Sequence, residues 1–111
     1  MQISYIAMPG IYRQANSPEM IQKHVAAYFN MEVEQMHKNS RKREVVQARQ
    51  IAMYFSKNKT KCSYAKIGEI IGGKDHATVL HACKTVNNLI ETDRQFRQQI
   101  EEIETRFNYK F

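Results

Sequence analysis

Two adjacent glycines followed at once by a helix cap constrain this sequence more than any other feature. Gly72 and Gly73 can adopt positive φ without a Cβ clash, so together they can end one helix and redirect the chain. Asp75 then offers a carboxylate to the open N–H groups of a new helix. Polar residues occupy its first turn, and an apolar stripe begins at Val79. A helix with an exposed first turn and buried later turns is typical of a recognition helix.

Helical periodicity extends through most of the chain. Apolar residues recur at intervals of three and four, and no segment alternates like a strand over more than a few residues. Ser17 and Pro18 form a strong helix start, as an N-cap followed by proline at the first helical position. The pattern predicts an all-α fold of about six helices, at residues 17–30, 31–37, 44–57, 63–71, 75–91 and 92–107.

The length of 111 residues fits one domain, which we place at residues 17–111. Residues 1–16 show no clear period, and Pro9 with Gly10 indicates a turn. We expect this N-terminal arm either to be disordered or to fold back onto the core. The stripe from Phe96 to Phe107 in the last helix is expected to be core, with dimerisation as the alternative.

The positive charge of the chain is concentrated in one segment. The formal net charge is +6, and residues 38–61 carry eight basic side chains and one acidic side chain. Residues 91–104 are net acidic. A basic segment is often only a solvated face, but beside a candidate recognition helix it favours a polyanionic partner.

The helices at residues 63–71 and 75–91 have the dimensions of a helix-turn-helix, although ordinary helical hairpins share that outline. Gly68 lies inside the first of them, where glycine costs roughly 1 kcal/mol relative to alanine. A glycine at such a position indicates a close crossing of two helices. The pair is therefore the candidate DNA-binding unit.

The first turn of the second helix suits base edges in a major groove. His76 can donate or accept, Thr78 offers a hydroxyl and a methyl, and Ala77 is small enough for close approach. Asp75 is expected to cap its own helix, with a cytosine amino group as the alternative partner.

Basic and hydroxyl side chains nearby are candidates for the DNA backbone. Lys57, Lys74 and Lys84 are natural phosphate contacts, and Ser63 at a helix N-terminus can hold a phosphate. Arg41 and Arg43, on what we expect to be a flexible link, can reach into a narrow minor groove. The alternative for these two arginines is solvated linker charge.

Other chemistry has little support in the sequence. Cys62 and Cys83 form no CxxC pair, so neither a disulfide framework nor a zinc ribbon is indicated. His76, His81 and Cys83 do not place three metal ligands on one helix face. We expect no enzyme activity, cofactor, small-molecule substrate or membrane span. The N-terminus is unlike a signal peptide, and a cytoplasmic location fits best.

At this point the chain resembles a known family. The thirteen residues from Gly72 to Lys84, GGKDHATVLHACK, are similar to the signature of the DNA-binding domain (domain IV) of the bacterial replication initiator DnaA. Its RQ-x-A-M-Y/A segment resembles Arg49 to Tyr54, and Ser63 to Gly68 resembles its S-x-x-x-IG helix. The similarity extends from about Ser17 to Phe107.

The resemblance implies a helix-turn-helix related to that of the Trp repressor. It also implies that this domain binds the DnaA box on double-stranded DNA. It implies that the segment from Asp75 to Thr78 reads bases in the major groove and that Arg41 reads the minor groove. The DNA-backbone contacts that it implies fall at Arg49, Gln50, Lys57, Ser63 and Lys74.

The sequence departs from the family pattern in three places. Ala77 replaces the first residue of a Thr-Thr pair, Gln47-Ala48 replaces Arg-Pro, and Ala65 replaces a proline that contacts bases. We therefore expect binding to box-like sites with an altered base preference.

The predicted function is sequence-specific binding of duplex DNA in replication initiation or its regulation, as a monomer on DNA. A full initiator has an upstream ATPase module that this sequence lacks. We therefore expect an excised domain or, as Met1 to Tyr12 favours, a stand-alone bacterial or phage protein associated with the nucleoid. The alternatives are a regulator competing for such sites and a protein-interaction module with an incidental basic face.

Overall fold

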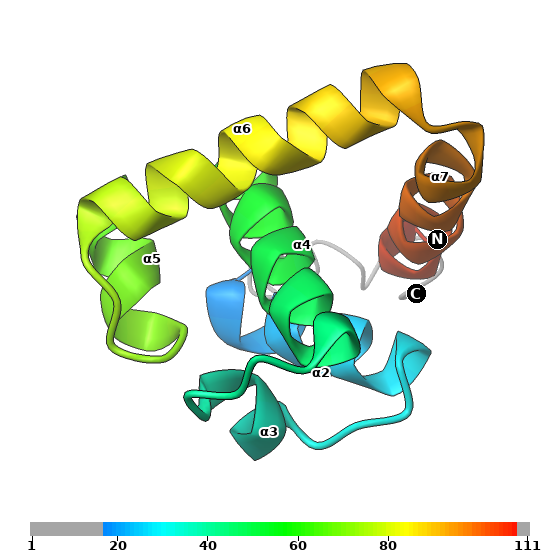
Figure 1. The fold of residues 1–111 in the computed structure, drawn as a ribbon. Helices are drawn as coiled ribbons and strands as arrows, with labels where there is room; N and C mark the ends of the chain where they lie inside the picture. The colour runs from blue at the N-terminus through cyan, green and yellow to red at the C-terminus, as the bar shows by residue number, and fades with distance from the viewer. Residues whose placement is uncertain (1–16, 109–111) are drawn as a thin grey trace, which may run out of the picture.

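The computed structural model describes residues 17–108, which form six α-helices and no strand (Figure 1). The predicted all-α fold is therefore confirmed. The N-terminal arm of residues 1–16 lies outside the described residues, so both expectations for it stay predictions. The helices are α2 (Pro18–Tyr28), α3 (Val33–His37), α4 (Arg43–Lys59), α5 (Tyr64–Ile70), α6 (His76–Thr92) and α7 (Arg94–Asn108).

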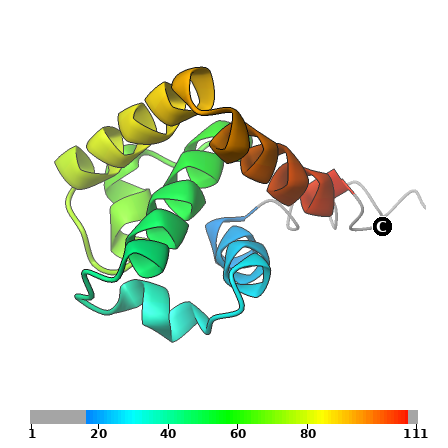
Figure 2. The ribbon, with the colours of Figure 1, turned by 45° about the vertical axis from the view of Figure 1, so that its right-hand side comes forward.

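The helix α4 is the centre of the fold. It packs against α2, α3, α5 and α6, and α7 closes the core against α2 and α6 (Figures 1 and 2). The α4 residues Ala48, Ile51, Ala52 and Phe55 are almost fully buried. Burial of each large apolar side chain contributes roughly 1.5–3 kcal/mol. The amphipathic pattern that predicted α4 is therefore also the pattern that assembles the domain.

Local capping explains where α2 begins and ends. Ser17 Oγ accepts a hydrogen bond from the Met20 N–H at 3.3 Å, and Pro18 occupies the first helical position. At the other end Asn30 has a φ of 58°, and the Met31 N–H reaches back to the Ala26 carbonyl at 2.9 Å. This left-handed residue, one position beyond the C-cap Phe29, closes the helix.

The predicted helix ends differ from the structure by one or two residues, and both ends of α4 are informative. The helix α4 begins at Arg43 rather than residue 44 and continues to Lys59 rather than residue 57. Arg43 is therefore helical, and its prediction as part of a flexible link was wrong. The extra turn at the C-terminal end is held by side chains: Asn58 Nδ2 donates to the Tyr54 carbonyl and Thr60 Oγ1 to the Ser56 carbonyl. An apolar stripe carries no information about such polar end turns.

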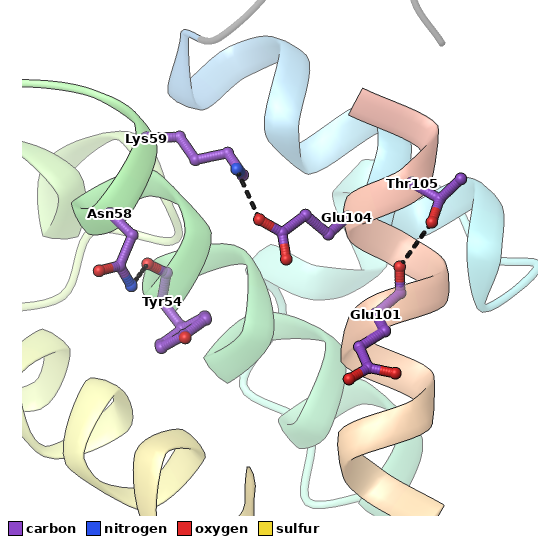
Figure 3. A network of polar contacts seen from close by, with 6 residues as sticks. All are labelled: Tyr54, Asn58, Lys59, Glu101, Glu104 and Thr105. Atoms are coloured by element: carbon purple, nitrogen blue, oxygen red, sulfur yellow. Dashed lines mark hydrogen bonds and ion pairs between the residues drawn. The ribbon is translucent and has the colours of Figure 1, made fainter. Parts of the chain in front are cut away.

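The last helix docks through both apolar and polar contacts. The Phe96-to-Phe107 stripe is buried in the core of this chain, as predicted, and the Phe107 ring meets Phe55 edge-on with centroids 5.0 Å apart. Lys59 Nζ on α4 lies 2.9 Å from Glu104 Oε2 on α7, and Figure 3 shows the two side chains extended toward each other. The same view shows the bonds Asn58–Tyr54 and Thr105–Glu101 within α4 and α7.

Tyr28 adds a second polar contact between α2 and α7. Its hydroxyl donates to Glu102 Oε1 at 2.6 Å, and this hydrogen bond, followed by burial, raises the pKa of Tyr28. The Arg106 guanidinium lies 5.3 Å from the centre of the Tyr28 ring. Because these groups are partly exposed, we expect the apolar contacts to dominate the docking of α7.

Adjacent residues of α7 separate these two kinds of contact. Ile103→Ala removes a fully buried side chain and should lower the free energy of unfolding by about 2–5 kcal/mol. Glu104→Gln removes the ion pair with Lys59 and should cost about 1 kcal/mol or less. Urea unfolding followed by circular dichroism measures both. A larger loss for Glu104→Gln than for Ile103→Ala would contradict this account.

Candidate nucleic-acid interface

The turn between α5 and α6 is built on close backbone contact. Gly72 and Gly73 have φ values of 86° and 63°, the positive values that the sequence predicted. The Lys74 N–H donates to the Gly68 carbonyl at 2.8 Å. A Cβ on Gly68 would overlap the Lys74 carbonyl oxygen and lie 2.9 Å from its carbonyl carbon. A close approach at Gly68 is therefore present, but it is to the backbone that leads into α6 and not, as the sequence predicted, to a second helix.

Short polar side chains cap both helices of the pair. Asp75 Oδ1 accepts from the Thr78 N–H at 2.9 Å. The hydrogen bonds from Thr78 hold the pKa of the Asp75 carboxyl below its usual value. Ser63 Oγ accepts from the Lys66 N–H at 3.1 Å at the start of α5. Asp75 therefore has the capping role that the sequence favoured, and Ser63 caps its own helix as well.

The first turn of α6 is exposed, whereas one face of its later turns is buried. His76, Ala77 and Thr78 are exposed, and Val79 is fully buried. Farther along, α6 packs on α4 and carries the buried residues Ala82, Cys83 and Val86. Ala65 is exposed on α5, the helix that packs against α6 (Figure 1). The structure thus exposes the candidate major-groove residues and buries the stripe behind them.

The basic link, residues 38–42 between α3 and α4, forms one wall of an open groove. The side chains of Arg41 and Arg43 are exposed and line this groove beside Leu89 of α6. Three side chains of α4 complete it: Val46, Gln47 and Gln50. The structure therefore places Arg41, Arg43 and Gln50 together, away from the first turn of α6.

Arg49 has contacts that sequence reasoning missed. Its Nε donates to the Met36 carbonyl at 2.9 Å, and its Nη2 donates to the carbonyls of Lys38 and Ser40 at 3.2 and 3.5 Å. None of the three bonds engages Nη1. A guanidinium on α4 thus holds the end of α3 and the link that follows it. Nothing in the sequence pattern indicates a pairing with these carbonyls.

Lys57 also has a structural partner. Its Nζ donates to the Cys62 carbonyl at 3.3 Å and lies 4.5 Å from the centre of the Tyr64 ring. These contacts hold the segment that enters α5. The remaining candidate phosphate contacts occupy different surfaces: Lys74 is half-exposed in the turn, and Lys84 is exposed on α6.

The cysteines and histidines form no further candidate site in the described part of the chain. Both thiols are free, and burial raises the pKa of Cys83, whose Sγ lies 3.9 Å from the Met53 carbonyl oxygen. Among residues 17–108, no three His, Cys, Asp or Glu side chains are grouped to hold a metal ion. Within the same range, every helix is too short or too polar to cross a membrane.

Comparison with known proteins identifies the family. The family model described as the bacterial dnaA protein helix-turn-helix matches residues 18–86, which include α2 to α5 and most of α6. This chain belongs to that family. The membership agrees with the resemblance in the GGKDHATVLHACK segment and with the helix pair α5 and α6. The helix α7 lies beyond the matched residues.

Curated relatives extend the similarity. Proteins named chromosomal replication initiator protein DnaA are 55% identical over 87 residues in Flavobacterium psychrophilum and 58% identical over 85 residues in Bacteroides thetaiotaomicron. These alignments cover 78% and 77% of this chain and 18% of each relative. The protein of that name in Crocosphaera subtropica is 41% identical over 106 residues, or 96% of this chain and 23% of the relative. The chain thus spans about a fifth of the length of these relatives.

Two glycine substitutions test the helix-turn-helix geometry. Gly68→Ala should lower the free energy of unfolding by about 3 kcal/mol, because its Cβ overlaps the Lys74 backbone. Gly73→Asn is the matched control: Gly73 has open space around its Cβ position, and asparagine tolerates positive φ, so we expect a loss below about 1 kcal/mol. Urea unfolding gives both values. A stabilising Gly68→Ala, as expected for an open helix position, would exclude the contact.

Proposed function

We propose that this chain binds double-stranded DNA sequence-specifically at DnaA-box-like sites. In this proposal the first turn of α6 enters the major groove and the basic link enters the adjacent minor groove. The observation that carries it is the placement of two exposed surfaces on one domain whose family is the bacterial dnaA helix-turn-helix. One surface is the polar first turn of α6, and the other is the arginine-lined groove beside Leu89.

The spacing of these surfaces suits a duplex. At 1.5 Å per residue, His76 and Leu89 lie about 20 Å apart along α6. One turn of duplex DNA rises about 34–36 Å, so neighbouring major and minor grooves on one side are about 17 Å apart. A domain with α6 entering a major groove can therefore bring Arg41 to the next minor groove.

Each candidate residue then has a chemical role. His76 and Thr78 contact base edges, Ala77 packs against them, and Asp75 fixes the first turn by capping it. Arg41 enters the minor groove, and Arg43 contacts its edge. Ala65, from α5, faces the major groove beside the first turn of α6. The DNA-backbone contacts in the proposal are Arg49, Gln50, Lys57, Ser63, Lys74 and Lys84.

The proposal includes a biological role and a stoichiometry. Because the similar curated proteins are named chromosomal replication initiator protein DnaA, we infer that this chain acts at replication origins, at the nucleoid. We expect one chain per site, since the apolar stripe of α7 is covered by the core of its own chain. The same burial removes the surface on which a dimerising protein-interaction module would depend.

Binding assays on the unmodified chain and its variants test this proposal. The unmodified chain should bind a DnaA-box duplex far more tightly than a scrambled duplex. Arg41→Ala should weaken the box complex roughly tenfold, mainly through A·T pairs in the minor groove. Lys84→Ala should weaken both duplexes alike and reduce the slope of log affinity against log salt by about 0.9.

Fluorescence anisotropy at several salt concentrations measures these effects. Arg97→Ala is the control, because it removes one exposed cation from α7, which takes no part in the proposed interface. Equal binding to box and scrambled duplexes would contradict sequence-specific recognition. An affinity independent of salt would contradict the phosphate contacts.

Ala77→Thr tests the altered base preference. Threonine restores the Thr-Thr pair of the family pattern and adds a hydroxyl and a methyl to an exposed position of α6. We expect the preference at one base pair to change by about 5- to 100-fold, the usual value of one direct base contact. Selection from a random duplex pool, performed with both proteins, measures the change. Identical selected sequences would exclude Ala77 from the base-reading surface.

A further inference from the structure

We propose that Arg49 is a positioning residue that holds the basic link in place so that Arg41 can read the minor groove. The inference rests on the proposed DNA binding and assigns Arg49 a role beyond the phosphate contact implied by the family resemblance. The claim concerns base discrimination in the minor groove, which a phosphate contact does not provide.

The three carbonyls that Arg49 binds are spread over the end of α3 and the link. Met36 is the penultimate residue of α3, Lys38 is its C-cap, and Ser40 lies two residues farther on. Carbonyls at a helix C-terminus lack partners within the helix, and a cation is favourable there. Arg49 meets both needs from α4, the helix that packs against α2, α3, α5 and α6.

Arg41 lies within the segment that these bonds restrain. The Ser40 carbonyl before it is bound by Arg49, and the Lys42 N–H after it donates to Ser40 Oγ at 3.2 Å. Arg43 then begins α4. The backbone is therefore held on both sides of Arg41, while the Arg41 side chain is exposed.

The end of α3, which Arg49 binds, also lies close to the helix-turn-helix. A Cβ on Gly72 would lie 3.6 Å from His37 Cα, so the glycine turn passes close to the end of α3. His37 Nε2 is hydrogen-bonded to Gln22 Oε1 of the buried part of α2. The end of α3 thus lies between the turn that precedes α6 and the link that carries Arg41.

Pre-ordering of the link explains why this arrangement favours selective binding. A free link of basic residues loses conformational entropy when it enters a groove, whereas an ordered link has lost much of that entropy on folding. An ordered link also presents Arg41 in one place, so the minor groove is read at one step of the duplex. Lysine cannot replace arginine here, because only the planar guanidinium reaches several carbonyls with its fixed fork of donors.

Limited trypsin digestion without DNA tests the restraint itself. Arg49→Lys retains the positive charge and removes the fork, so cleavage after Lys38, Arg41, Lys42 and Arg43 should accelerate roughly tenfold. Mass spectrometry identifies the sites. Arg97→Lys makes the same exchange on exposed α7 and should leave these rates unchanged. A thermal melt confirms that each variant is folded. Unchanged cleavage in Arg49→Lys would overturn the restraint.

A double-mutant cycle tests the effect on base reading. The A·T pairs of the box that are sensitive to Arg41→Ala are replaced by G·C pairs in one duplex and by inosine·cytosine pairs in a second duplex. The two duplexes then differ only in the N2 amino group of guanine, which lies in the minor groove. The unmodified chain should prefer the inosine duplex about tenfold. In Arg41→Ala and in Arg49→Lys the preference for the inosine duplex should fall to about twofold or less. The double variant should show no further fall in this preference.

The outcomes separate this inference from the proposed function. If Arg49→Lys keeps the full inosine preference, or weakens both duplexes equally and additively with Arg41→Ala, Arg49 is only a phosphate contact and the inference is wrong. If the unmodified chain binds the box without any inosine preference, no minor-groove reading exists and the inference also fails. If the chain does not distinguish the box from a scrambled duplex, the proposed function itself is wrong.

Discussion

The candidate DNA-binding unit depends on one close approach, between the backbone of α5 at Gly68 and the backbone of Lys74. The Lys74 N–H bond to the Gly68 carbonyl, at 2.8 Å, brings the chain back against α5 before α6 begins. Two left-handed glycines make the return possible within a few residues. This contact sets the direction of α6, and that direction decides which side chains of its first turn are exposed.

A second constraint acts at the N-terminal end of α4. The link before this helix has no apolar residue of its own to bury, so polar contacts must hold it. Three hydrogen bonds from Arg49 provide those contacts. The two exposed surfaces of the proposed interface are thus supported by different means: backbone packing at Gly68 and a guanidinium at the end of α3. The glycine turn also passes close to His37 at the end of α3, the helix whose C-terminus Arg49 binds.

The sequence predicted features that depend on neighbouring residues. The caps Ser17, Ser63 and Asp75 and the glycine turn are local signals, and the structure contains each of them. The helix ends that carry polar residues were less predictable, because side-chain bonds such as Asn58 to Tyr54 extend a helix past its apolar stripe. The candidate site could be predicted as a set of residues, since charge and motif both lie in the sequence.

The contacts of Arg49 and Lys57 could not be predicted, because their partners are backbone carbonyls that only the fold brings close. Backbone carbonyls are present at every residue, so no residue type marks the ones that a side chain will reach. The docking of α7 through Lys59 and Glu104 has the same character: residues far apart in the sequence become neighbours only in the packed domain. Sequence patterns describe faces and ends of helices, whereas these contacts depend on tertiary packing.

The most direct test of the account is a chemical-shift map of the folded chain titrated with a DnaA-box duplex. If α6 and the link contact one duplex, amide shifts should concentrate at residues 38–43, 49–50, 63–65 and 74–78. Smaller shifts are expected near Lys57 and Lys84, the remaining proposed phosphate contacts. The outer face of α7 and the hollow between α2 and α3 lined by Glu19, Glu32 and Glu34 should change little. Shifts confined to the first turn of α6, or centred on α7, would contradict the central claim that one domain reads both grooves.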